Sequence, residues 1–310
     1  ILSTHLCARV FTRLPQMELT IGREARRVMR RLGLALSGGG FRATLYHLGV
    51  VRFLRDAKLL DSVTHITSVS GGSVLAAHLV LNWERYSGST QDFDAAAQEV
   101  LDFVRLDVRN RIIRRYPFAA SLNLALRLGR QGRSRKYTRT GLLENHYKTH
   151  LFGDTCLFQL PVAPELHILS TNLSEGGLSS FTRSGLLIEK RTQSADVEMS
   201  EHRVGLATVP MAVAASSAFP GFFPPLELTA DDVGALDGDF PTLFFTDGGV
   251  YDNLGVRMFH YLDHRQRRTL CESDFVDMEA AISAWNHAAD GSESTPLRRM
   301  TEIYASSVAS

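Results

Sequence analysis

The sequence predicts an α/β fold with three layers, in which a mostly parallel central sheet lies between helices. Two successive segments, 32–54 and 63–81, share one pattern: a short β-type run, a glycine-rich turn, and an apolar run long enough for a helix. This alternation is typical of parallel strands joined by crossover helices, with both faces of the sheet covered. A chain of 310 residues is long enough to bury one large core of this kind.

The first segment begins with Leu32–Leu36, a short run that predicts a buried strand. The turn Gly38–Gly40 follows. The next run, Phe41–Leu54, is apolar almost all round and is interrupted mainly by His47 and Arg52, which predicts a buried helix.

The second segment places a serine on a sharp turn. Residues 63–67 predict a strand that ends at Ser70-Gly71-Gly72, and the apolar run Val74–Leu81 predicts the helix that follows. A strand, turn and helix of this kind hold a serine hydroxyl clear of the sheet, and the helix amides favour negative charge beside it. Ser70 is therefore a candidate nucleophile, and the alternative is a Ser-Gly-Gly loop that only caps a helix.

The first glycine loop also fits a dinucleotide-binding pattern, because Gly38 to Ala43 reads G-x-G-x-x-A after a strand. That fold requires an acidic residue at the end of the second strand, to hold a ribose. This chain has Ser70-Gly71-Gly72 at that position, so no cofactor is expected. The amides of Gly38, Gly39 and Gly40 are instead predicted to form an oxyanion hole for an acyl-transfer intermediate.

The chain outside these two segments differs from them in composition. Residues 1–31 form a basic N-terminal arm, residues 32–310 one domain, and residues 87–150 a helical insertion in it. Further elements are predicted as a strand at Leu166–Thr171, strands with a turn at Gly185 in Ser179–Lys190, a small-residue helix ended by prolines in Val209–Pro225, and a buried strand at Thr242–Thr246.

A serine nucleophile needs a base, and Asp247 follows the last of these strands in the run Thr246-Asp247-Gly248-Gly249. The alternative is an ordinary β-turn with aspartate in its first position. A Ser, Asp, His order, as in α/β-hydrolases, could be completed by His260, His264 or His287.

Taken together, these motifs resemble those of the patatin-like phospholipases of the bacterial type, with a Ser-Gly-Gly-Gly-Phe-Arg block similar to the cytosolic phospholipase branch. The resemblance implies a Ser70–Asp247 dyad without histidine, an oxyanion hole from Gly38–Gly40, and Arg42 near the lipid phosphate. Ser68 stands where the family has its first elbow glycine, and it is small enough to keep the turn. The resemblance covers four stretches in the family's order: Leu34–Ser73, Ser170–Gly176, Ala215–Pro225 and Phe245–Asn253.

The function expected is that of a serine lipid acyl hydrolase, of phospholipase A or lysophospholipase type, which cleaves fatty acyl esters of (lyso)phospholipids. Two alternatives stay open: a lipid-binding regulatory pseudoenzyme on the same fold, and a histidine-dependent esterase. No metal site is expected, because His146 and His150 are four residues apart but lack an evident third ligand.

Charge and cysteine content bear on partners and location. With 34 Lys+Arg against 33 Asp+Glu, nucleic acid is not an expected partner, and the sequence makes no prediction of oligomeric state. The three cysteines are scattered singly, which favours a reducing compartment. We expect a cytoplasmic protein at the membrane periphery; because the chain begins at Ile1, a secreted protein with its targeting segment removed is the alternative.

A local excess of positive charge predicts the membrane contact. The segment Arg105–Arg139 holds eleven Arg+Lys and one acid, Asp107. Basic, partly amphipathic segments dock on anionic bilayers. The alternative is an arginine-rich solvated cap or a site for another acidic partner, with the leucines of the segment packed on the sheet. Apolar residues are expected on one helical face up to Pro117, which is expected to end the pattern: Leu101, Val104, Val108 and Ile112.

Overall fold

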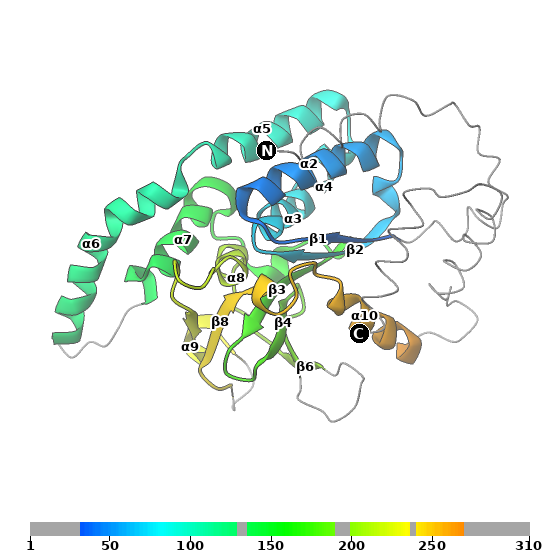
Figure 1. The fold of residues 1–310 in the computed structure, drawn as a ribbon. Coiled ribbons are helices and arrows are strands. Elements are labelled where there is room, and N and C mark those ends of the chain that lie inside the picture. Colours follow the sequence, from blue (N-terminus) through cyan, green and yellow to red (C-terminus); the bar gives the residue numbers. More distant parts are fainter. Residues whose placement is uncertain (1–31, 129–134, 190–198, 236–239, 270–310) are drawn as a thin grey trace, which may run out of the picture. The chain divides into compact units, whose positions relative to one another are not determined.

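The computed structural model describes residues 32–128, 135–189, 199–235 and 240–269, and in them one mixed sheet of eight strands with helices on both faces (Figure 1). The predicted three-layer α/β/α architecture is confirmed. The strands are β1 (Leu32–Leu36), β2 (Val63–Val69), β3 (Glu165–Asn172), β4 (Gly177–Phe181), β5 (Leu186–Glu189), β6 (Met199–His202), β7 (Leu226–Leu228) and β8 (Leu243–Asp247).

The centre of the sheet is parallel, as predicted: β1 pairs with β2, and β2 with β3, all in one direction. From β3 outward the strands β4, β5 and β6 pair antiparallel. The short connection between β3 and β4 explains the change, because a parallel crossover needs a dozen or more residues and a hairpin does not.

Strand β8 completes the arrangement that later positions the site. Strand β2 pairs with β3 as far as the Val69–Leu169 pair, and β8 pairs with β3 from Ser170–Asp247 onward, running in the opposite direction. Strand β4 pairs with Ile168–Asn172 on the other edge of β3, so β2 and β8 share one edge. Their carboxyl ends therefore meet head to head along that edge.

The helices cover the two faces unequally. Residues from α2, α3, α5, α7 and α8 join one large apolar core on one face, while Met258 and Leu262 of α10 pack on Val69, Leu169 and Leu178 on the other. The helices are α2 (Gly40–Asp56), α3 (Gly71–Leu81), α4 (Trp83–Ser87), α5 (Thr90–Val104), α6 (Val108–Leu128), α7 (Arg139–Tyr147), α8 (Val209–Ser216), α9 (Ala230–Val233) and α10 (Arg257–Thr269).

Helix α2 differs from the buried helix predicted for Phe41–Leu54. Its buried residues follow one stripe, Thr44, His47, Leu48 and Val51, whereas Tyr46 is 71% exposed. The reason is its place: α2 packs on α3, which is buried from Gly71 to Val80 and takes the inner position. An outer helix buries only the i, i+3, i+4, i+7 stripe.

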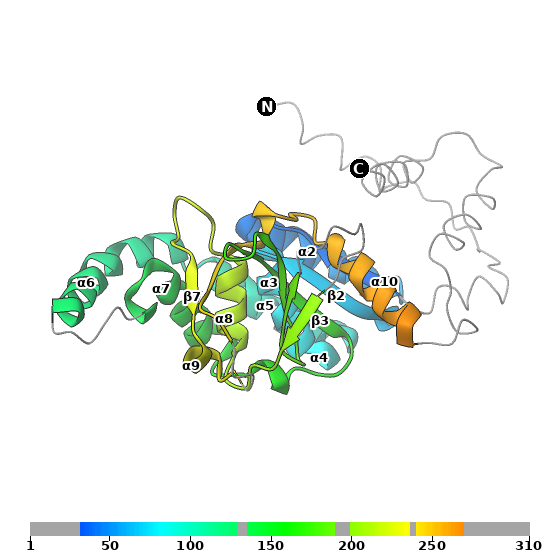
Figure 2. The ribbon, with the colours of Figure 1, turned by 90° about the horizontal axis from the view of Figure 1, so that it is seen from below.

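The segment predicted as a helical insertion contains α5, α6 and α7. The single helical face expected from Leu101 to Ile112 is wrong, because α5 ends at Val104 and α6 begins at Val108, with Asp107 at φ 50° between them. Helix α6 also continues through Pro117. In both views it extends away from the sheet, and it packs against α7 and the short helix η2 (Arg135–Tyr137) (Figures 1 and 2).

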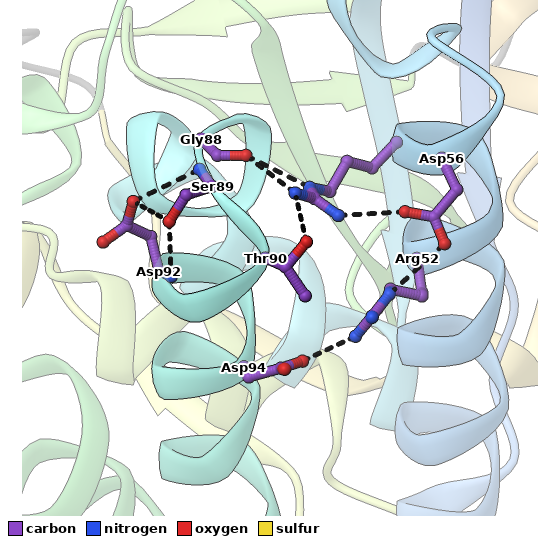
Figure 3. A network of polar contacts seen from close by, with 8 residues as sticks. Arg52, Asp56, Gly88, Ser89, Thr90, Asp92 and Asp94 are labelled. Atoms are coloured by element: carbon purple, nitrogen blue, oxygen red, sulfur yellow. Dashed lines mark hydrogen bonds and ion pairs between the residues drawn. The ribbon is translucent and has the colours of Figure 1, made fainter.

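A polar network joins α2 to the start of α5 (Figure 3). Arg52 bridges Asp56 and Asp94, which lie on the two helices. Ser89 and Asp92 form a reciprocal capping box that satisfies the first amides of α5. The network fixes how the helical segment leaves the sheet.

Among the described residues, no helix is long and apolar enough to cross a membrane. The predicted basic arm, 1–31, lies outside them.

Candidate active site

Ser70 lies on the sharp turn between β2 and α3, with φ 52° and ψ −122°. A non-glycine residue pays for positive φ in strain, and such strain is concentrated at functional sites. A Cβ on Gly71 would overlap the carbonyl oxygen of Gly40, and one on Gly72 that of Leu36. Glycine is therefore required after Ser70, because the turn and the first glycine loop are in backbone contact.

Asp247 is the last residue of β8 and is 4% exposed. Its carboxylate Oδ1 accepts the amide of Gly249 at 2.8 Å, and its carbonyl accepts the Thr171 hydroxyl at 2.9 Å. A Cβ on Gly248 would lie 2.6 Å from the carbonyl oxygen of Leu169, so the strand can turn away here only at glycine. The side chain and backbone of Asp247 are thus both fixed.

The structure places Ser70 and Asp247 at the facing carboxyl ends of β2 and β8, and the Ser70 side chain is near enough to the Asp247 carboxyl to lower its pKa. Burial raises the pKa of Asp247, and the bonds from Ser70 and Gly249 oppose that rise. The pairing follows from the sheet, because β2 and β8 end against each other beside Ser170 of β3. A buried carboxylate with a raised pKa, beside a serine on a strained turn, can take the proton of that hydroxyl.

The glycine loop beside Ser70 corrects one prediction. The Gly38 amide donates to the carbonyl of Asn253 at 2.9 Å, so it is already satisfied and does not face the site as an oxyanion donor. Gly39 and Gly40 have φ 143° and 61° and begin α2. Amides in the first turn of a helix have no intrahelical partner, so those of Gly39 and Gly40 remain as donors.

Comparison with known proteins shows the family of the chain. The family model described as "Patatin-like phospholipase" matches residues 34–260, which is most of the chain and includes both Ser70 and Asp247. The chain belongs to the patatin-like phospholipase family. No curated protein matches the sequence.

Several solved structures are similar to this member of the patatin-like family. Human GIVD cytosolic phospholipase A2 in complex with methyl gamma-linolenyl fluorophosphonate inhibitor and terbium chloride is 18% identical, with a TM-score of 0.43, over 70% of this chain and 35% of that one. Human GIVD cytosolic phospholipase A2 in a second structure is 17% identical, with a TM-score of 0.43, over 61% and 28%. VipD from Legionella pneumophila is 14% identical, with a TM-score of 0.34, over 72% and 47%. This chain therefore spans from about a quarter to about half the length of these structures.

The remaining candidate residues of the patatin-like domain are Arg42 and five histidines. Arg42 is exposed on the first turn of α2, next to the glycine loop. His260 is exposed on α10, while the side chain of His264 and all of His287 lie outside the described residues. The ring centroids of His146 and His150 lie 4.4 Å apart with their planes tilted by 58°, and no group of three or more metal-ligating side chains occurs in the described part of the chain.

Sequence reasoning missed one contact of the nucleophile. The backbone amide of Ser70 donates to the hydroxyl of Ser216, at the carboxyl end of α8, over 2.9 Å. Ser216 lies in the stretch Ala215–Pro225 that carries the family resemblance, but only the packing of α8 against α3 and β3 places it behind Ser70.

Proposed function

We propose that this protein is a serine acyl hydrolase that cleaves fatty acyl esters of phospholipids and lysophospholipids. One observation carries the proposal: Ser70, on a strained turn at the amino end of α3, faces the buried carboxylate of Asp247 where β2 and β8 end beside β3. In this site nucleophile, base and glycine amides all come from the protein's own chain.

The reaction follows from these groups. The Ser70 oxygen attacks the ester carbonyl carbon while Asp247 takes the serine proton, and the amides of Gly39 and Gly40 bond the resulting oxyanion. Collapse of the tetrahedral intermediate breaks the ester bond, and the leaving alkoxide takes the proton from Asp247. Water then attacks the acyl-serine and gives a proton to Asp247. That proton returns to Ser70 as the fatty acid leaves.

Exposed apolar side chains on the loops of the site favour a lipid substrate. Phe219 is 64% exposed and follows Ala218, whose carbonyl accepts the amide of Asp247. Val250 and Leu254 are exposed just after Asp247. Acyl chains can lie against such residues, and Arg42 can meet a lipid phosphate from the neighbouring loop.

Helix α6 supports a second part of the proposal, contact with an anionic membrane. Arg111, Arg114 and Arg115 are exposed on it, and Phe118 is 76% exposed. A helix with basic and large apolar side chains in water binds anionic bilayers through both charge and burial of apolar surface.

The test is incubation of the protein with mixed phospholipid vesicles and mass spectrometry of the products. Ser70→Ala and Asp247→Asn should each remove nearly all release of fatty acid, and the double variant should be little worse, because the pair acts as a unit. The matched control is Ser179→Ala, which removes a buried hydroxyl without a bond in β4. Lipid binding without products would instead show a regulatory pseudoenzyme. Loss of turnover in a folded His260→Ala and His264→Ala variant would favour the histidine-dependent esterase.

A further inference from the structure

We propose that Ser216, at the carboxyl end of α8, is a positioning residue that holds Ser70 for reaction, through a chain of buried serine hydroxyls that ends on β3. This inference rests on the proposed function and concerns a residue that touches neither substrate nor reacting atoms. It also assigns a role to Ser68, where the family has a glycine.

The chain of hydroxyls has one consistent direction. The carbonyl of His167 can only accept, and the Ser68 hydroxyl donates to it over 3.3 Å. Ser73 donates to Ser68 over 3.1 Å, and the hydroxyls of Ser73 and Ser216 lie 2.9 Å apart. With Ser73 already donating, Ser216 donates to Ser73, which leaves a Ser216 lone pair to accept the amide of Ser70 at 2.9 Å.

Burial makes each of these bonds costly to lose. Ser68, Ser73 and Ser216 are completely buried, so water cannot replace a missing partner. A buried donor without an acceptor costs about 1–3 kcal/mol. Without Ser216 the amide of Ser70, a half-buried residue, would lose its acceptor, and Ser70 could then relax from its strained φ of 52°.

The same end of α8 also holds the base. The carbonyl of Ala218 accepts the amide of Asp247 at 3.1 Å and the hydroxyl of Thr246 at 2.8 Å. Ser216 and Ala218 are two residues apart. One short stretch of backbone therefore binds the amide of the nucleophile Ser70 through Ser216 and the amide of the base Asp247 through Ala218. Residues 216–218 therefore set the distance between the Ser70 hydroxyl and the Asp247 carboxylate.

The test compares Ser216→Ala with the control Ser179→Ala in three measurements. We expect the kcat of Ser216→Ala to fall about 10–100-fold with KM little changed, since small displacements of a nucleophile cost about that much. We expect the acid limb of the pH profile to move to higher pH, because a displaced Ser70 no longer lowers the pKa of Asp247. We also expect faster amide hydrogen exchange in the peptide that contains Ser70.

Two further variants test the chain itself. Ser68→Ala should lower kcat less than Ser216→Ala and shift the acid limb the same way. Added to Ser216→Ala, it should cause no further loss, because the chain no longer reaches Ser70. If Ser216→Ala fails to fold, Ser68→Ala tests the positioning role. Unchanged kcat and an unchanged acid limb in Ser68→Ala would then refute it.

The outcomes separate the two proposals. If Ser216→Ala lowers only the melting temperature, with kcat per folded molecule and the acid limb unchanged, the positioning role is refuted. If the wild type releases no fatty acid, the proposed function fails. In that case amide hydrogen exchange in the peptide that contains Ser70 still tests whether Ser216 holds Ser70. Equal exchange rates in wild type and Ser216→Ala would refute the positioning role as well.

Discussion

Asp247 combines two demands that oppose each other, a buried position and a negative charge. Burial raises its pKa above the value of about 3.9 that an exposed aspartate has. Since the base must be ionised, we expect the acid limb of kcat/KM to have its midpoint above pH about 3.9. A pH profile of phospholipid hydrolysis measures this midpoint, and a midpoint below that value would contradict Asp247 as the base.

The same shift has a consequence for stability. A raised folded pKa gives a contribution that is fully present below the unfolded pKa and is lost as pH rises through the folded pKa. Asparagine carries no charge to desolvate, so Asp247→Asn should gain stability relative to wild type between about pH 4 and about pH 8. Urea unfolding at both pH values measures the gain, and Asp61→Asn, at an exposed carboxylate, is the control. If the difference in free energy of unfolding between Asp247→Asn and wild type does not increase with pH, the prediction is refuted.

Arg42 carries a separate prediction about the substrate. Its guanidinium is exposed next to the loop of Gly39 and Gly40, where it can pair with a phosphate but has no part in the chemistry. Arg42→Ala should therefore reduce phospholipid hydrolysis several-fold and hydrolysis of an uncharged ester little. Lys58→Ala, at an exposed cation after α2, should affect neither. Equal losses on both substrates would remove the phosphate role.

For single residues, the sequence predicted the roles that are visible from neighbouring residues in the chain. Ser70 and Asp247 stand out because each is followed by glycines at the end of a strand, and the two strands end against each other beside β3. The assignment of Gly38 as an oxyanion donor was wrong, since its partner Asn253 is over two hundred residues away in the chain. Ser216 was missed for the same reason. Contacts between distant segments have no signature in either segment alone.

Among the elements, the junction of α2 and α5 allows a test of which polar contacts matter. The Arg55 side chain is largely buried and donates to the carbonyl of Gly88, to Thr90 and to Asp56. Asp94 is exposed, and its ion pair in this network is with Arg52 (Figure 3). Arg55→Met should lower the free energy of unfolding by about 1–3 kcal/mol and Asp94→Ala by at most about 1 kcal/mol. Chemical denaturation checks the order, and equal losses would contradict it.

Elements were predicted where the pattern along the chain is strong, as at β1, at β3 and at the turn at Gly185. Two details were wrong because tertiary packing decides them. Helix α2 is apolar in composition but is the outer helix, so it buries only the stripe Thr44, His47, Leu48 and Val51. Pro117 does not end α6, because packing of α6 on α7 and η2 supports the helix across it.

In the whole described domain, the direction of β8 is the feature that sequence could least predict. Its residues read as a buried strand, and buried strands look alike whichever way they run. Only the pairing with the second half of β3 turns β8 against β2 and brings Asp247 to Ser70. A β8 parallel to β3 would place its carboxyl end at the opposite end of that edge. The active site is thus a product of topology, and the two motifs supply its chemistry.

The last prediction concerns how the domain approaches its substrate. Helix α6 extends away from the sheet (Figure 2). The side chains of Arg111, Arg114 and Arg115 on it are exposed. Helix α6 is linked to the loop after α8, because the guanidinium of Arg139 of α7 lies over the ring of Tyr116 of α6 and over that of Phe222 in the loop.

Each basic side chain near an anionic surface contributes about 1 kcal/mol. Replacing the three arginines of α6 with glutamine should therefore weaken binding to anionic vesicles about 10- to 100-fold, and raised salt should do the same to the wild type. Hydrolysis of a soluble monomeric ester should not change. Lys58→Gln, at a cation on another element, is the control for net charge. Co-sedimentation with vesicles measures the binding, and unchanged binding of the triple variant would show that α6 does not carry the membrane contact.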